Sequence, residues 1–295
     1  MTTTRYLDLD CVSLSNKFLS LLVTQSVGPR IISLRFHGGD NLFAELPDFT
    51  VTRPDGSIFH FYGGHRLWQA PEDVWSTYAL DNSPVNISQT GNELVAVQEA
   101  SPETGIEKSI QISLVDNKPQ LTVTHMLTNR GTSGVECAPW ALTQFKTGGV
   151  AILPQSQKKT EFLPNRSLVL WPYTDISNPN VHWGNRYILV RAEMEGEIFK
   201  VGFPNPRSWL AYWQAGTLFL KRAAFDPQAH YYDFNSSSEC YCNNQFLELE
   251  TLGPVTTLTP GASVIHTETW ELYANVESPK TEDTAQKIVE TLGLE

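Results

Sequence analysis

Apolar and polar residues alternate with a period of two through most of this chain, and no other feature constrains the fold as strongly. The clearest alternating segments are 30–36, 108–114, 120–126, 245–249 and 264–272. Because successive side chains of a strand point to opposite faces, these segments predict half-buried antiparallel strands. Gly-Pro, Asp-Gly and Pro-Gly pairs recur between such segments and are typical of turns in a meander of strands.

One segment near the C-terminus has a different period. Four apolar residues recur there at helical spacing, namely Ala285, Ile288, Val289 and Leu292. Gly293 follows as a stop signal, so we expect a short helix over about 280–292 that packs its apolar side on a sheet. The 295 residues contain no linker-like or repeated segment. The sequence therefore predicts one large all-β domain over residues 1–295, built from two stacked sheets.

The charge balance argues against several classes of partner. The chain has 21 Lys and Arg residues against 32 Asp and Glu residues, a formal charge of −11. That charge repels phosphate backbones and anionic lipids, so we expect neither nucleic acid nor a membrane surface as partner. Asp8 and Asp10 stand where a secretory signal would need an apolar core, which predicts a cytoplasmic protein. The four cysteines have neither disulfide nor zinc spacing, and we expect them to be reduced.

A first candidate site is the segment Phe59–Glu72, which contains Gly63, Gly64, His65, Arg66 and Trp68. A sugar needs this mixture of residues, because its hydroxyls accept hydrogen bonds from Arg66, its C–H face stacks on Trp68, and the glycines leave room. A structural turn with a surface ion pair explains the same residues equally well.

A second candidate is the strand segment 245–254. Alternation places Phe246, Glu248 and Glu250 on one face and Leu247 and Leu249 on the other. If the first face is concave, burial would raise the pKa of Glu250 and suit it to act as a general base. Spacing alone favours the plainer interpretation, an exposed strand face with two carboxylates.

His182 lies in a polar, ring-rich segment over 178–186 and is a third candidate. A histidine taken alone is more often a structural or surface residue than a catalytic one.

Several of these motifs together resemble the galactose-mutarotase-like superfamily, which includes the aldose 1-epimerases, and a bacterial branch of it in particular. The segments that carry the resemblance are Leu21–Glu45, Gly63–Trp68, Ala138–Ala141, Leu249–Thr251, Leu258–Gly261 and Thr269–Leu272. It covers nearly the full chain. It implies a large antiparallel β-supersandwich with a short C-terminal helix.

The resemblance also implies an aldose-1-epimerase-like isomerase that opens and recloses the ring of a sugar by acid–base chemistry. We expect a neutral sugar, because a phosphate group would need a denser basic cluster than Arg66 and Arg186 supply. Glu250 matches the catalytic base through its Leu-Glu-Thr context. The family carries its acid, a histidine, in the region that corresponds to 140–145, and that region has none here. His65 and His182 are the available substitutes, and His65 is preferred because its segment is rich in glycine and contains Arg66. The further sugar contacts expected are Arg66, Trp68, Trp140, His182 and Glu248. Proton transfer between oxygens needs no metal and no organic cofactor, so none is expected.

The missing family histidine motivates an alternative, a non-catalytic sugar-binding protein on the same scaffold. A β-sandwich module related to those of glycoside hydrolases or polysaccharide lyases fits less well, because 295 residues leave no room for a second catalytic domain. The particular sugar and the oligomeric state are not predicted.

Overall fold

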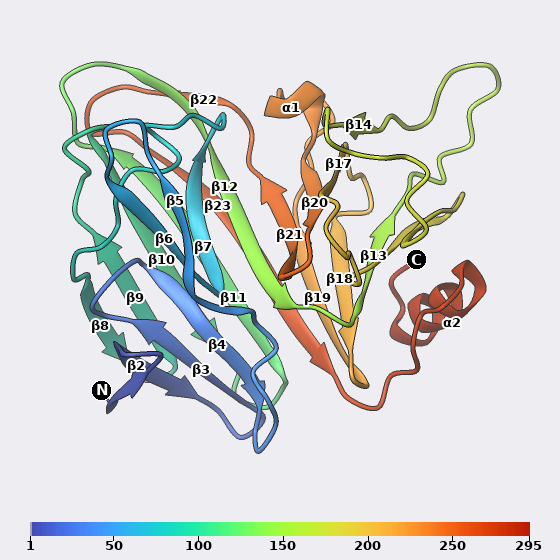
Figure 1. The fold of residues 1–295 in the computed structure, drawn as a ribbon, viewed down its shortest axis with the longest axis horizontal. Coiled ribbons are helices and arrows are strands. Elements are labelled where there is room, and N and C mark those ends of the chain that lie inside the picture. Colours follow the sequence, from blue (N-terminus) through green and yellow to red (C-terminus); the bar gives the residue numbers. More distant parts are fainter. Residues whose placement is uncertain (1) are drawn as a thin grey trace.

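Two large antiparallel sheets packed face to face make up the computed structural model, which describes residues 2–295 (Figure 1). In spatial order the first sheet contains β1 (Thr2–Tyr6), β2 (Leu9–Ser15), β3 (Leu19–Thr24), β4 (Arg30–Phe36), β7 (His65–Ala70), β12 (Val135–Lys146), β21 (Phe246–Leu252), β20 (Ser238–Cys242), β17 (Phe199–Phe203) and β14 (Val169–Leu170), and β22 (Thr256–Leu258) pairs with β12.

The second sheet contains β15 (Val181–Trp183), β16 (Tyr187–Arg191), β13 (Val150–Pro154), β18 (Trp209–Gln214), β19 (Thr217–Ala223), β23 (Ser263–Tyr273), β11 (Gln120–Asn129), β10 (Ile106–Leu114), β9 (Glu93–Gln98) and β8 (Asn86–Thr90). A separate hairpin is formed by β5 (Glu45–Thr52) and β6 (Ile58–Gly63). The predicted antiparallel β-supersandwich is confirmed, and each of the five alternating segments lies on or overlaps a strand.

The main hydrophobic core lies between the two sheets. Alternation decides which residues enter it: β10 contributes Ile110 and Ile112, and β21 contributes Leu247 and Leu249. Buried aromatic rings fill its centre, where Phe219 and Trp270 meet edge to face with ring centroids 5.2 Å apart. Each such side chain stabilises the fold by about 1.5–3 kcal/mol through removal of apolar surface from water.

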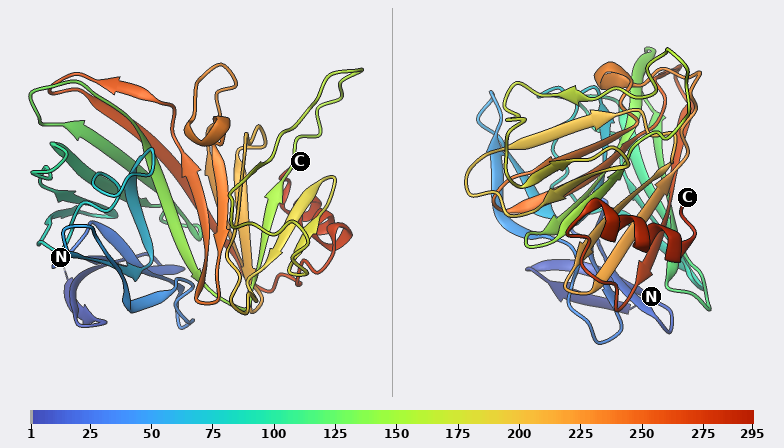
Figure 2. Two further views of the ribbon diagram at one scale, coloured as in Figure 1. Left: turned by 45° about the horizontal axis from the view of Figure 1, so that its top comes forward. Right: turned by 90° about the vertical axis from the view of Figure 1, so that its right-hand side faces the viewer.

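The C-terminal helix α2 (Glu282–Leu292) confirms the predicted helix and its packing. Its side chains Ala285, Ile288 and Val289 join one apolar cluster with strands β13, β16, β18 and β19, so the helix covers the outer side of the second sheet (Figure 2). Thr281 caps the N-terminus by accepting a hydrogen bond from the backbone N–H of Thr284, and Gly293 ends the helix with φ of 64°. A single turn, α1 (Tyr232–Asn235), precedes β20. Within residues 2–295 no helix has both the length and the apolar character required to cross a membrane.

The face of the first sheet that points away from the second sheet, here called the outer face, is also covered. The β5–β6 hairpin lies over it, and Phe59 and Phe61 of that hairpin share an apolar cluster with Trp68 of β7 and Trp140 of β12. Charged side chains on the central strands are therefore enclosed on this face, and the candidate site lies among them.

Candidate functional site

A cavity of about 180 Å³ lies on the outer face of the first sheet. Eight aromatic side chains line it, together with Val51, Leu142 and three charged residues, Glu72, Lys200 and Glu248. We call it the aromatic cavity. Ligand sites for drug-sized molecules measure about 300–1,000 Å³. The aromatic cavity is smaller, so it suits a ligand of one small ring.

Glu248 and Glu250 both project from the outer face of β21, as alternation predicted. Glu248 lines the cavity and is 7% exposed. Its Oε1 accepts a hydrogen bond of 2.8 Å from Nε2 of Gln144, and among residues 2–295 its other oxygen has no hydrogen-bond partner. Glu250 is fully buried and is not among the lining residues. Its Oε2 accepts hydrogen bonds from Trp140 Nε1 at 2.8 Å and from Lys200 Nζ at 3.2 Å.

Lys200 of β17 connects two of the buried carboxylates. Its Nζ forms ion pairs with Oε2 of Glu239 at 2.7 Å and Oε2 of Glu250 at 3.2 Å. The ammonium also lies over the rings of Trp140 and Trp171, 4.8 and 4.6 Å from their centroids. Burial lowers the pKa of Lys200, but the neighbouring carboxylates, Glu250 first, more than offset this and hold that pKa well above its usual value. Burial raises the pKa of Glu239, although Lys200 acts in the opposite direction. Lys200 is therefore the counter-ion of Glu250 and also holds the carboxyl group of Glu239.

No cation of the described residues 2–295 forms an ion pair with Glu248. Burial, and then the charge of Glu250, raise the pKa of Glu248 to about 8, although Lys200, Arg66 and the Gln144 hydrogen bond act in the opposite direction. At neutral pH the group that faces the cavity is thus a carboxylic acid with a proton to donate.

Trp68 and Arg66 lie on the same face of β7 and differ in access to the cavity. Trp68 lines it. Arg66 is 2% exposed and lies behind the wall, with its guanidinium carbon 4.8 Å from the ring centroid of Phe61 and its Nη2 donating to the Phe61 carbonyl oxygen. Arg66 was expected to contact the sugar directly, but its guanidinium does not line the cavity. It packs instead against the aromatic side chains of the cavity wall.

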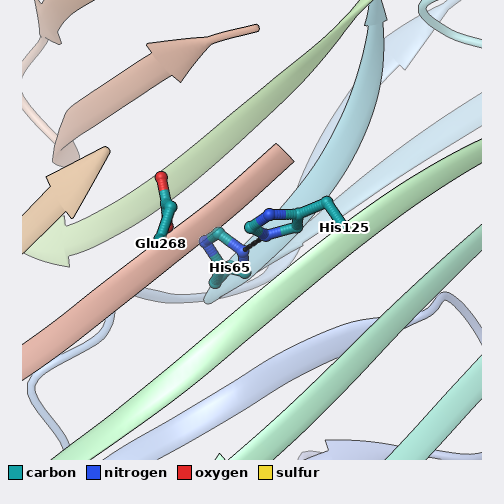
Figure 3. Close-up of side chains that lie close together, drawn as sticks. All are labelled: His65, His125 and Glu268. Carbon is teal, nitrogen blue, oxygen red and sulfur yellow. Dashed lines mark hydrogen bonds between the residues drawn. The ribbon is translucent and has the colours of Figure 1, made fainter. Parts of the chain in front are cut away.

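His65 points to the opposite side of the sheet from Arg66, into the space between the two sheets (Figure 3). Its Nδ1 is 2.9 Å from Thr143 Oγ1, and its Nε2 is 2.7 Å from His125 Nε2. Because adjacent strand residues face opposite ways, His65 cannot share the cavity with Glu248 or Trp68. The expectation that His65 supplies the acid beside Glu250 therefore disagrees with the structure.

The ligand atoms of His65, His125 and Glu268 all lie within 4.8 Å of one another, the spacing of a candidate metal site. Hydrogen bonding argues against that use. His125 Nδ1 donates to the His266 carbonyl oxygen, so its Nε2 accepts the proton of His65 Nε2. Lys221 Nζ lies 2.8 Å from Glu268 Oε1, where a metal ion would need that oxygen. The cluster is a closed hydrogen-bond network that does not fit a cation.

His182 lies on β15, at the edge of the second sheet, and lines a different cavity of about 490 Å³ with Arg191 and Lys280. The structure therefore brings Glu248, Trp68 and Trp140 together at the aromatic cavity, with Glu250 and Arg66 one layer behind, and leaves His65 and His182 elsewhere.

Sequence reasoning missed Lys200 and Glu239, and it included Glu72 in the first candidate segment without a role at the site. Lys200 is the one charged residue in the strand segment Phe199–Phe203, and Glu239 stands opposite two core cysteines, Cys240 and Cys242, in the alternation of β20. Charged residues in otherwise apolar strands were the available signal. Glu72 lies in a loop, where no periodicity points to it.

Neither a family model nor a curated protein sequence matches the chain. Solved structures do. A galactose mutarotase-like protein from Lactobacillus casei superimposes with a TM-score of 0.58 and 12% identity, over 89% of this chain and 100% of its own. A protein described as a candidate aldose 1-epimerase from Klebsiella pneumoniae matches with a TM-score of 0.59 and 11% identity, over 96% of this chain and 84% of its own.

The chain has the galactose-mutarotase-like fold. A TPR-domain containing protein from Parabacteroides distasonis, 15% identical and with a TM-score of 0.59, contains the same fold: 93% of this chain matches 50% of that longer one. The galactose-mutarotase-like fold therefore occurs both by itself and as part of larger chains. At these identities the likeness concerns architecture, and the chemistry has to be argued from the residues of the aromatic cavity.

Proposed function

We propose that this protein binds a single sugar ring in the aromatic cavity and interconverts its anomers by proton transfer. One observation carries the proposal: Glu248, a carboxylic acid whose pKa is raised to about 8, faces a small cavity with aromatic walls. Aromatic rings stack on the C–H faces of sugars, and a carboxylic acid that keeps its proton at neutral pH is a general acid.

The proton transfers follow from which groups line the cavity. Glu248 donates its proton to the ring oxygen while a base removes the proton of the anomeric hydroxyl. The bond between C1 and the ring oxygen breaks, C1 becomes an aldehyde carbon, and ring closure after rotation of the carbonyl reverses both transfers. Glu72 serves as the base, since it lines the cavity and its Oε1 accepts a hydrogen bond of 2.7 Å from the Tyr78 hydroxyl. Lys200 stabilises negative charge on the reacting oxygens.

Glu250 has a supporting role in this proposal. It holds Lys200 and Trp140 in place through its Oε2, and it raises the pKa of Glu248 through its charge. A residue that acts in this way positions the reacting groups without touching the sugar.

Exchange NMR or polarimetry with a panel of aldoses tests the proposal against the spontaneous rate in buffer. Because general acid–base catalysis contributes about 10²–10⁴-fold, we expect Glu248→Gln and Glu72→Gln each to lower the catalysed rate by about a hundredfold or more. The exposed Glu99→Gln is the control with the same change of charge, and it should keep the full rate. Equal rates for wild type and Glu248→Gln on every sugar that binds would contradict the enzymatic proposal.

A second candidate function is non-catalytic sugar binding. It is favoured by the observation that, in the part of the chain the structure describes, no histidine lines the aromatic cavity, while Glu250 is held by Lys200. It predicts that Tyr173→Ala, at the 45% exposed rim residue, weakens sugar binding by about tenfold, and that no variant changes the rate of anomer exchange from that of buffer.

A further inference from the structure

Carboxyl groups outnumber cations around the aromatic cavity. Glu72 and Glu248 line it, Glu250 follows Glu248 on the same face of β21, and Glu239 of β20 is the cross-strand neighbour of Glu250. Among residues 2–295, Lys200 is the one cation on the lining, and both of its ion pairs go to Glu239 and Glu250. The unpartnered oxygen of Glu248, on a side chain 93% buried, is thus left to face the cavity without a counter-ion.

Arg66 does not fill that place. Its Nη2 donates to the Phe61 carbonyl oxygen, and its guanidinium lies among the rings of Phe59, Phe61 and Trp68 at 4.8–5.4 Å from their centroids. The partner that Glu248 lacks therefore has to come from the cavity side.

The walls of the aromatic cavity suit an ammonium group. The negative faces of aromatic rings attract cations, most strongly where water is excluded. Lys200 already shows this at the edge of the cavity, where its ammonium lies 4.8 Å from the Trp140 ring centroid and 4.6 Å from that of Trp171. Seven more lining rings, including Phe61, Trp68 and Tyr173, offer faces or edges to whatever occupies the remaining space.

We propose that the sugar bound in the aromatic cavity carries a free, protonated amino group that pairs with Glu248, so that the ligand class is an amino sugar. This inference rests on the sugar-binding part of the proposed function and replaces the neutral sugar expected from the sequence. A Glu248 that pairs with an ammonium has lost its proton, so the amino sugar is a bound ligand, and the ring-opening step with Glu248 as acid applies to sugars without an amino group. An N-acetylated amino sugar has no ammonium and does not qualify.

The pairing has a measurable consequence for protons. Without ligand, Glu248 faces Glu250 on its own strand, Tyr241 on β20, Lys200 on β17, Arg66 on β7, and Glu72 and Tyr78 on the loop after β7, and it keeps its proton. An added ammonium stabilises the ionised form of Glu248, and the proton leaves to the solvent. Binding at a pH below 8 therefore releases up to one proton for each ligand bound.

Titration calorimetry at about pH 6.5 tests this with matched pairs: D-glucosamine and D-glucose, D-galactosamine and D-galactose, D-mannosamine and D-mannose. Each measurement is repeated in two buffers of different ionisation enthalpy, which counts the protons released. For at least one pair we expect the amino sugar to bind about tenfold or more tightly than its parent, with proton release, and the N-acetyl derivative to bind no more tightly than the parent.

Glu248→Gln should remove both the preference for the amino sugar and the proton release. The control Glu99→Gln, at an exposed residue just beyond β9, should keep both. Tighter binding of the parent sugars, or equal binding of both, would overturn the amino-sugar inference and leave the proposed sugar function standing. Binding of neither would overturn both. If choline binds as tightly as any amino sugar, the cavity recognises an ammonium group without a sugar ring, and both the amino-sugar inference and the proposed sugar function are overturned.

Discussion

Glu248 and Glu250 are two residues apart on one face of one strand, yet their surroundings give them different chemistry. Glu250 has Lys200 and Trp140 as partners. Glu248 has only a neutral amide, from Gln144, and it faces the cavity. The carboxyl group available to a ligand is therefore the one without a cation, and its proton affinity can be tested without knowing the ligand.

The raised pKa of Glu248 links folding stability to pH. The folded protein holds the proton up to about pH 8, whereas the unfolded chain loses it above about pH 4.5, so this group's contribution to stability falls as pH rises between those values. Between about pH 5.5 and 7.5, we expect the stability of wild type relative to Glu248→Gln to fall by about 1.4 kcal/mol per pH unit. Urea denaturation of both proteins measures it. A constant difference would contradict the raised pKa.

Lys200 stabilises two buried carboxylates at once, so its removal should be costly. Lys200→Met leaves Glu250 buried without a counter-ion and removes the cation beside Glu239, and we expect a loss of about 3–5 kcal/mol in the free energy of unfolding. The triple variant Lys200→Met, Glu239→Gln, Glu250→Gln should recover much of this loss, because no buried charge then lacks a partner. Lys118→Met, at an exposed lysine, is the control and should change stability by less than about 0.5 kcal/mol. A single variant as stable as that control would contradict the ion-pair network.

At the scale of elements, helix α2 depends on a local signal that is easily tested. Thr281 accepts from the backbone N–H of Thr284, and the Thr284 side chain accepts from the backbone N–H of Thr281. Replacing this N-cap by Thr281→Ala should lower the free energy of unfolding by about 1 kcal/mol, as measured by urea denaturation. Thr291→Ala, at an exposed position inside the helix, should have little effect by comparison. Equal effects would show that the cap does not stabilise α2.

The alternation of side chains along a strand determines which residues of β7 can reach the aromatic cavity. On β7, His65 enters the space between the sheets, whereas Arg66 and Trp68 take the outer face. A strand delivers every second residue to one side, so neighbours in a motif such as Gly-Gly-His-Arg cannot act on the same ligand. His65 is next to Arg66 in the sequence, but this did not place the two side chains at the same site.

For the whole molecule, buried histidines between the sheets set the acid limit of stability. Burial lowers the pKa of His65 and His125, and that of His266 to about 3, so the unfolded chain binds protons below about pH 6.5 that the folded protein cannot. These three groups therefore make stability fall as pH falls. Glu239 has a raised pKa like Glu248, and these two carboxyls act in the opposite direction.

Because the histidines dominate below about pH 6.5 and the two carboxyls above it, we expect maximum stability near pH 6.5. Urea midpoints measured from about pH 4.5 to 8 locate the maximum. Below the pH of maximum stability, the free energy of unfolding should depend less steeply on pH in His266→Gln than in wild type, by up to about 1.4 kcal/mol per pH unit. A stability that rises steadily up to pH 8 would contradict this balance.

Much of the fold could be predicted from this sequence because its determinants are local. Alternation at period two marks strands such as 108–114, and a helical stripe with a glycine stop marks α2. The same alternation correctly grouped Glu248 with Glu250. Alternation does not tell which of two faces is covered, nor which strands from distant parts of the chain become neighbours.

What the sequence by itself determined is therefore the period of each element, the faces of each strand and, by resemblance, the galactose-mutarotase-like architecture. Only the tertiary structure decided that β17 and β20 bring Lys200 and Glu239 beside β21, that His65 is enclosed between sheets, and that Glu248 rather than Glu250 faces a cavity. The physical reason is that the charge state and the accessibility of a side chain depend on its burial and on its contacts. These contacts join residues far apart in the sequence, and Gln144 and Glu248 are more than a hundred residues apart. Such contacts leave no periodic trace in the chain.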